Sequence, residues 1–170
     1  MKNIIILRHA KSDWSDSTLD DFDRPLNKRG KKAAPLMGKI LALSQVPVNL
    51  VLSSPANRAK NTALLALEEL DYDVPVKWVE DFYHGDTSSF LDTIKELDDS
   101  IETIMVVGHN PGLENLIEDL VSAGSLQIKL PTAGLVFIEC SSPTWTMIDQ
   151  SYCELKWFLI PRLIKKILKG

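Results

Sequence analysis

Three short segments of the chain carry arginine or histidine directly after an apolar run. Their sequences are Arg8-His9-Ala10-Lys11-Ser12, Ser53-Ser54-Pro55-Ala56-Asn57-Arg58-Ala59 and Gly108-His109-Asn110-Pro111-Gly112. A guanidinium group binds two phosphate oxygens at once, and an imidazole can hydrogen-bond to the same anion. If the fold brings the three segments together, they predict a cationic pocket for a phosphate group.

The elements that must position these segments are indicated by runs that are apolar almost throughout, as in strands covered on both faces. Helical stretches fall between the first three runs, and this alternation is the signature of an α/β fold. We expect a three-layer α/β/α sandwich with a mainly parallel central sheet. The predicted strands are Asn3–Leu7, Leu50–Ser53, Thr103–Gly108 and Leu135–Glu139, and the predicted helices are Lys28–Leu43, Pro55–Leu70, Ser88–Leu97 and Pro111–Val121.

Weaker patterns predict strands at Val76–Val79 and at Trp145–Gln150, with the latter pairing with Leu135–Glu139 through the turn at Ser141–Thr144. The segment Asp13–Arg24 is dense in aspartate, and we interpret it as a solvated loop beside the site. At the C-terminal end, Leu163, Ile164, Ile167 and Leu168 share one helical face and the lysines share the other. This pattern suits a membrane surface or, as we prefer, a final helix packed on the core.

Ligands of open α/β sheets bind beyond the carboxyl ends of the strands, where all three cationic segments are expected. Ser54 and Asn110 are suited to the N-cap position of a helix, with Pro55 and Pro111 at its first position. Free backbone N–H groups at helix starts attract anions, which again indicates phosphate.

A length of 170 residues fits a single domain, residues 1–170. With 19 basic and 23 acidic side chains the net charge is -4, so the chain has no overall positive field for a nucleic acid partner. The apolar run Ile4–Leu7 is too short for a signal peptide or a membrane span. The two cysteines, Cys140 and Cys153, are expected as unbridged thiols, and a cytoplasmic location follows as the default.

The sequence resembles the histidine phosphatase, or phosphoglycerate-mutase-like, superfamily. The hallmark of that superfamily is a strand that ends in Arg-His followed by a small residue. The resemblance spans most of the chain: Arg8-His9-Ala10, Asp23-Arg24-Pro25-Leu26-Asn27-Lys28-Arg29-Gly30, Ser53-Ser54-Pro55 with Arg58-Ala59 and Thr62-Ala63, and Gly108-His109-Asn110-Pro111. The short length and the Arg-His-Ala-Lys-Ser opening are most similar to SixA-type phosphohistidine phosphatases. That similarity implies a phosphatase whose substrate carries phosphate on histidine.

The resemblance also implies roles for individual residues. His9 would be the nucleophile that forms a transient phosphohistidine, and Arg8, Arg58 and His109 would hold the phosphoryl oxygens. A carboxylate that protonates the leaving group would be Glu80 or Asp81, and the sequence leaves that choice open. Further candidates for substrate contact, or alternatively for loop and capping roles, are Lys11, Ser12, Arg24 and Asn110.

Three other functions are alternatives to a phosphohistidine phosphatase. A small phosphate ester is an alternative substrate to a phosphorylated protein. A zinc-dependent hydrolase using His9, His84 and His109 is another alternative, although these residues lack the short spacing of paired metal ligands. A phosphate-binding module without turnover is the non-enzymatic alternative. We expect no metal or organic cofactor and no membrane partner.

Overall fold

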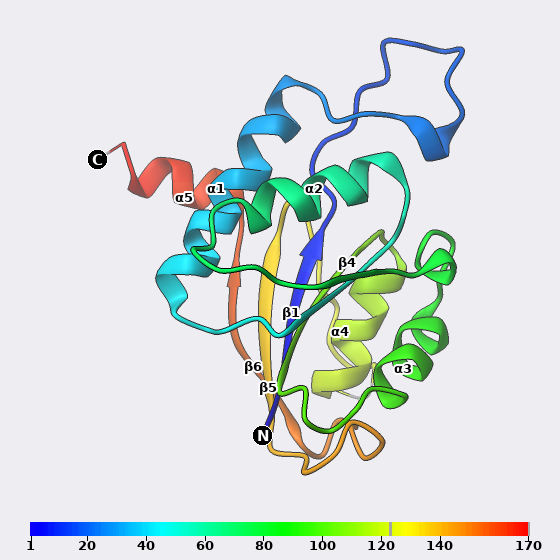
Figure 1. Cartoon of the computed structure of the whole chain (residues 1–170), viewed down its shortest axis with the longest axis vertical. Coiled ribbons are helices and arrows are strands. Elements are labelled where there is room, and N and C mark those ends of the chain that lie inside the picture. Colours follow the sequence, from blue (N-terminus) through cyan, green and yellow to red (C-terminus); the bar gives the residue numbers. More distant parts are fainter. Residues whose placement is uncertain (123, 170) are drawn as a thin grey trace.

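The computed structural model, which describes residues 1–122 and 124–169, is built around a six-stranded sheet with the strand order β3-β2-β4-β1-β5-β6 (Figure 1). The strands are β1 (Lys2–Arg8), β2 (Leu50–Ser53), β3 (Val76–Trp78), β4 (Thr103–Gly108), β5 (Leu135–Cys140) and β6 (Cys153–Leu159). The first four strands pair in parallel, whereas β5 pairs antiparallel with β1 and β6. The expected mainly parallel sheet is confirmed.

Helices cover both faces of this sheet (Figure 1). They are α1 (Lys28–Ser44), α2 (Asn57–Leu67), α3 (Thr87–Lys95), α4 (Gly112–Ser122) and α5 (Pro161–Ile167), with short 3-10 turns at η1 (Asp21–Asp23) and η2 (Glu80–Phe82). Buried residues of α1, α2 and α5 pack on one face, and those of α3 and α4 pack on the other. The predicted three-layer α/β/α architecture is therefore confirmed.

Strand β1 shows why its inner run, Ile4–Leu7, is apolar at every position. Ile4 and Ile6 pack under α3 and α4, while Ile5 and Leu7 pack under α1 and α2. Successive side chains of a strand point to opposite faces, so a strand covered on both sides buries all of them. Full burial of such a side chain contributes about 1.5–3 kcal/mol, which makes this central strand a main source of stability.

The predicted strand at Trp145–Gln150 is wrong, because the last strand is β6, Cys153–Leu159. Trp145 is fully buried, its indole N–H donates to the Ile101 carbonyl oxygen at 2.8 Å, and its backbone N–H donates to the Asp99 carboxylate at 2.8 Å. The segment therefore anchors a turn rather than adding to the sheet. Strand β6 alternates exposed Glu154 and Lys156 with more buried residues, as an edge strand should.

The expectation of two unbridged thiols is also wrong, since Cys140 and Cys153 form a disulfide. They are opposite each other in the register between β5 and β6, a pairing that depends on where β6 lies. The bridge removes the argument that the cysteines supplied for a reducing compartment.

The C-terminal helix α5 packs on the core through Pro161 and Ile164, as preferred from the sequence. Leu163, Ile167 and Leu168 are exposed, so the apolar face expected there is only partly buried. Within the described residues, we find no helix with the length and apolar content needed to cross a membrane.

Candidate active site

The three cationic segments meet where the carboxyl ends of β1, β2 and β4 lie side by side (Figure 1). The backbone N–H of His9 donates to the Gly108 carbonyl oxygen at 3.1 Å, and that of Ser54 donates to Val107 at 2.9 Å. The rings of His9 and His109 are 5.0 Å apart between centroids. Both histidines are almost buried, with exposed fractions of 8% and 9%.

A short hydrogen bond defines the tautomer of His9. Its Nδ1 lies 2.8 Å from the Ala10 carbonyl oxygen, which can only accept, so Nδ1 carries the proton and Nε2 keeps a lone pair. The Ala10 N–H donates to Thr62 Oγ1 at 2.9 Å, and Thr62 Oγ1 donates to the Arg58 carbonyl at 2.6 Å. The bonds of Ala10 and Thr62 connect the loop after β1 to α2.

Both ring systems are held neutral. Burial lowers the pKa of His9 to about 4; the Ala10 hydrogen bond and Asp21 oppose this shift, and the charges of Arg58 and Arg8 add to it. Burial, followed by His9 and Arg58, lowers the pKa of His109 to about 3. A neutral imidazole is the nucleophilic form of histidine, so at neutral pH His9 has the protonation state that a nucleophile would require.

We expect the rings of His9 and His109 to stay neutral down to about pH 5. An unfolded histidine binds a proton below about pH 6.5, so stability is highest above that pH and falls as pH drops toward 4. By pH 5 the loss is about 2 kcal/mol for each histidine, at about 1.4 kcal/mol per pH unit. Ring nitrogen NMR shifts followed from pH 7 to 4 measure this directly. A titration midpoint near 6.5 for His9 would contradict the prediction.

Arg58 is buried and bound to the exposed carboxylate of Asp21. Its Nη2 lies 2.8 Å from Asp21 Oδ2, and its Nη1 donates to the Asp21 carbonyl oxygen. The Tyr83 hydroxyl donates to the same carboxylate at 2.9 Å, and Arg24 Nε lies 3.6 Å from it. Partial burial works to raise the pKa of Asp21, but hydrogen bonds from Tyr83 and Arg58 hold it below its usual value. The Asp21 carboxylate is therefore an anion of the protein itself that already binds Arg58.

Sequence reasoning missed Asp21, because it treated Asp13–Arg24 as a solvated loop. The loop instead turns at η1 and directs one aspartate to Arg58. The available signal was the density of aspartates next to a segment expected to be cationic, but five aspartates lie in that stretch and no pattern singles out Asp21.

Arg8 and Asn110 meet at a different group, the carbonyl oxygen of Leu130. Arg8 Nη1 donates to it at 2.7 Å, and Asn110 Nδ2 donates at 2.9 Å. Arg8 also lines a cavity of about 330 Å³ with Glu114 and Leu130. The charge of Arg8 contributes to the lowered pKa of His9, so it acts on the pocket from this neighbouring position.

Three further candidates from the sequence lie on the loop that borders the pocket. Ser12 is buried and its Oγ accepts the indole N–H of Trp14 at 3.0 Å. The Arg24 guanidinium lies 4.0 Å from the centre of the Trp14 ring, a cation–π contact. Lys11 is exposed, and its carbonyl accepts the Asn27 N–H at 3.0 Å. In this structure, Ser12 and Trp14 stabilise the loop. Arg24 interacts with the pocket only indirectly, through its ion pair with Asp21.

Glu80 and Asp81 begin η2, and both are exposed. Tyr83, which follows them, packs edge-on against His109 with ring centroids 5.7 Å apart. Within residues 1–122 and 124–169, neither carboxylate has a hydrogen bond or ion pair with His9, His109 or Arg58. The choice between the two as proton donor stays open.

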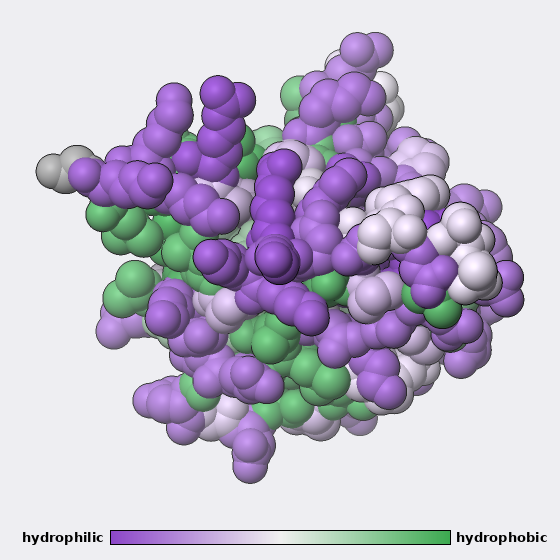
Figure 2. Space-filling model, turned by 90° about the horizontal axis from the view of Figure 1, so that it is seen from above, coloured by the Kyte–Doolittle hydropathy of each residue, from purple (hydrophilic) through white to green (hydrophobic). Residues whose placement is uncertain are grey.

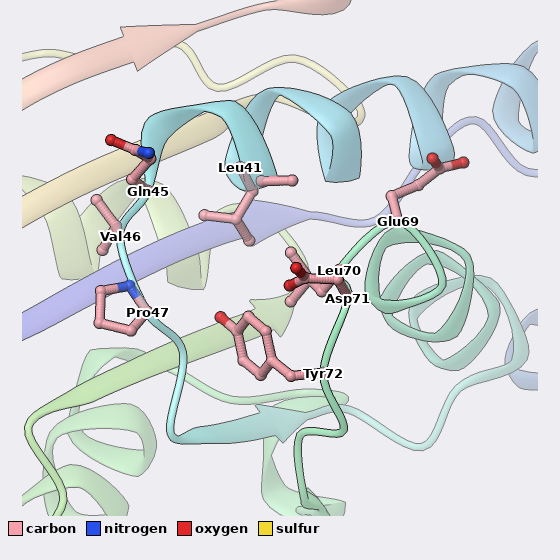
Figure 3. Close-up of a pocket in the computed structure, with 9 residues that line it drawn as sticks. Leu41, Gln45, Val46, Pro47, Glu69, Leu70, Asp71 and Tyr72 are labelled. Atoms are coloured by element: carbon pink, nitrogen blue, oxygen red, sulfur yellow. The ribbon is translucent and has the colours of Figure 1, made fainter.

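No group of three or more histidine, cysteine or carboxylate side chains in the described part of the chain is arranged to hold a metal ion. A cavity of about 450 Å³ lies instead between the ends of α1 and α2, lined by Leu41, Pro47 and Tyr72 among others (Figure 3). Its residues precede β2 and β3, so it is at the amino ends of the strands. The cluster around His9 is at the opposite edge, where ligands of such sheets bind.

Comparisons with known proteins concern the family and the fold of the chain. A model of the family described as "Histidine phosphatase superfamily (branch 1)" matches residues 4–83. An uncharacterized protein of Mycobacterium tuberculosis strain H37Rv is 31% identical over 164 residues, covering 92% of this chain and 100% of the relative. An uncharacterized chloroplastic protein of Arabidopsis thaliana is 34% identical over 154 residues, covering 85% and 69%.

Solved structures extend the comparison to the whole fold. The crystal structure of a candidate phosphohistidine phosphatase SixA from Agrobacterium tumefaciens aligns with a TM-score of 0.78 and 27% identity, covering 94% of this chain and 99% of that chain. A protein histidine phosphatase SixA complexed with tungstate aligns with a TM-score of 0.81 over 95% and 99%, and at 21% identity this second match concerns the fold alone.

Proposed function

Because the chain belongs to the histidine phosphatase superfamily, we propose that this phosphatase removes phosphate from phosphohistidine in proteins, by way of a phosphoryl group carried on His9. The observation that carries the proposal is the hydrogen bond from His9 Nδ1 to Ala10, which leaves a neutral Nε2 beside the cationic Arg58. We also propose that residues 1–170 act as one catalytic domain.

In the first step, His9 Nε2 attacks phosphorus in line, the Nε2–P bond forms, and the bond from phosphorus to the substrate nitrogen breaks. The substrate imidazole departs with the bonding electron pair. A ring that is already protonated on its other nitrogen leaves as neutral imidazole, so phosphohistidine depends little on a protein acid. In the second step, water attacks phosphorus, the Nε2–P bond breaks, and inorganic phosphate is released.

Electrostatic stabilisation would come from the groups around His9. Charge spreads over the three equatorial oxygens in the transition state, where fixed donors are most effective. Arg58 offers two guanidinium nitrogens, and His109, whose Nε2 is 2.9 Å from Ser54 Oγ, has a buried Nδ1 without a hydrogen-bond partner among the described residues. Substrate phosphate would displace the Asp21 carboxylate from Arg58.

The substrate proposal is supported by the similarity to the Agrobacterium protein. A panel of phosphohistidine protein, phosphoserine, phosphotyrosine and small sugar phosphates tests it. We expect kcat/KM for phosphohistidine protein to exceed every other value at least tenfold. A preference for sugar phosphates would reject the phosphohistidine substrate while keeping the phosphatase.

Asp21→Asn should tighten inhibition by inorganic phosphate about tenfold. The change removes the carboxylate that is ion-paired with Arg58, so an oxyanion no longer competes with a like charge. The inhibition constant for phosphate is the measurement. Asp20→Asn is the matched control, since Asp20 is the exposed neighbour of Asp21. Unchanged or weaker inhibition in Asp21→Asn would contradict the displacement of Asp21.

The double variant Glu80→Gln/Asp81→Asn should separate substrates by leaving group. Hydrolysis of phosphoserine should slow at least tenfold, because an alkoxide must be protonated as it leaves, while hydrolysis of phosphohistidine should change less than twofold. Values of kcat measured on both substrates with the same enzyme preparation decide the matter. Equal losses would mean that these carboxylates act on the structure and not on the leaving group.

A further inference from the structure

A cationic groove lies between α1 and α5, beside the candidate active site. A cavity of about 440 Å³ is lined by Pro161 and five cations, which are Arg29, Arg162, Lys165, Lys166 and Lys169. On α5, the spacing of Arg162, Lys165 and Lys166 puts these residues on one side of the helix, and Lys169 follows one turn later. We call this feature the α1–α5 groove.

The positive charge of the groove is concentrated and unbalanced. Residues 28–32 and 161–169 hold eight of the 19 basic side chains of the chain and none of its 23 acidic ones. Within the ranges that the structure describes, the five cations of the groove have no ion pair with a carboxylate. Like charges gathered in this way repel one another, so a bound anion would lower the energy of the groove.

The start of α1, which supplies Arg29 to the groove, contacts the loop that carries His9. The Asn27 N–H donates to the Lys11 carbonyl at 3.0 Å, and Gly30 packs directly against the Lys11 backbone, where a side chain would not fit. The start of α1, including Arg29, is thus beside a residue only two positions after His9. Seen over the carboxyl ends of the strands, hydrophilic side chains gather around the end of α5 at the left of Figure 2.

We propose that the α1–α5 groove binds an acidic segment of the substrate phosphoprotein, so that aspartate and glutamate side chains dock there while the phosphorylated histidine enters the pocket at His9. This proposal rests on the proposed function. Charge complementarity supports an acidic ligand, and a concave site between two helices suits a protein segment better than the surface of a bilayer. The groove would therefore select among phosphoproteins by the charge that flanks the phosphohistidine.

The first test measures binding without catalysis. A fluorescein-labelled, unphosphorylated peptide rich in glutamate, and its glutamine analogue, are titrated with the full chain. We expect the glutamate peptide to bind and the variant Arg162→Gln/Lys165→Gln/Lys166→Gln to bind it at least tenfold more weakly. The control Lys39→Gln/Lys77→Gln/Lys95→Gln removes the same charge elsewhere and should stay within twofold. Equal weakening in both variants, or no binding by the wild type, would overturn the proposal.

The second test measures turnover on two phosphohistidine peptides that are flanked by glutamate or by glutamine. In the groove variant, KM for the glutamate peptide should rise at least fivefold with kcat unchanged, while the glutamine peptide keeps its KM. Equal KM values for the two peptides in the wild type would reject the groove. Hydrolysis of neither peptide, together with tight binding of the glutamate peptide, would instead reject the proposed function.

Two other anions serve as competitors in the binding test. Vesicles of phosphatidylserine and phosphatidylcholine, and a single-stranded oligonucleotide, are compared with the glutamate peptide at the same salt concentration. We expect neither to displace the peptide at equal charge concentration. Displacement that requires the groove cations, by vesicles or by the oligonucleotide, would assign the groove to that ligand and overturn the assignment to an acidic protein segment.

Discussion

Replacing His9 by alanine should reduce kcat by about 10⁴-fold or more, the scale of loss seen when a nucleophile is removed. The reason is that the proposed reaction has no other route to a covalent intermediate once Nε2 is absent. Mass spectrometry after rapid quench with phosphohistidine peptide should find one phosphate on His9 in the wild type and none in the variant. Added imidazole, which supplies the missing ring, should restore part of the activity.

The matched control is His84→Ala, which removes an exposed histidine that packs against Tyr83 at a tilted angle and leaves His9 in place. This variant should keep activity within about threefold. A phosphorylated residue other than His9, or His9→Ala enzyme with near-normal turnover, would eliminate His9 as the nucleophile. The tautomer set by Ala10 would then be a structural feature of the loop only.

Arg58→Ala should lower kcat/KM by about 10²–10³-fold, comparable to removing one fixed donor from a preorganised oxyanion site. One terminal nitrogen of Arg58 binds the Asp21 carboxylate and the other binds the Asp21 backbone carbonyl, so both nitrogens are already oriented toward oxygen acceptors. Arg58→Lys should recover only part of the loss, since an ammonium keeps the charge without the planar pair of donors. Steady-state kinetics with phosphohistidine peptide measure both effects.

Tungstate or vanadate binding provides an independent readout of the same variants, and it should weaken in the order wild type, Arg58→Lys, Arg58→Ala. Lys60→Gln, an exposed change on the same helix, is the control and should leave both measurements within twofold. A loss of less than threefold in Arg58→Ala would mean that Arg58 holds Asp21 and contributes little to the reaction.

The fold was predicted correctly for the strands that helices cover on both faces of the sheet. Strands β1, β2, β4 and β5 are covered by helices on both faces, so each contains a run of consecutive apolar residues that stands out in the chain. Strand β6 is at the edge of the sheet, with a mixed pattern that competes with nearby turns. The prediction of Trp145–Gln150 followed apolar content, but Trp145 is buried through contacts of a turn. The disulfide was missed for the same reason, because it requires the register of β6.

Helix starts were predicted less well than helices. The sequence suggested Ser54 as an N-cap, whereas α2 begins at Asn57 with Ala56 as its N-cap. Ser54 Oγ lies instead 2.9 Å from Nε2 of His109 and accepts the Ala56 N–H at 3.3 Å. A serine before a proline is chemically suited to cap a helix. Here its hydroxyl instead contacts His109, which follows the neighbouring strand β4. Similarly, α4 begins at Gly112 rather than at Pro111.

By itself the sequence determined the order of the central strands along the chain, the helices between them, and the residue types that follow each central strand. Local hydrophobic pattern specifies a buried strand, and a parallel sheet necessarily gathers the residues that follow its strands at one edge. His9, Arg58 and His109 could therefore be singled out before any coordinates.

Only the tertiary structure decided which atoms face one another. The pairing of Asp21 with Arg58 joins residues 37 positions apart, and the groove joins α1 to the last helix of the chain. Such contacts depend on how separate elements pack, and nothing in the local pattern of either partner encodes the other. The same holds for the low pKa of His9, since it arises mainly from burial, and burial is a property of the assembled fold.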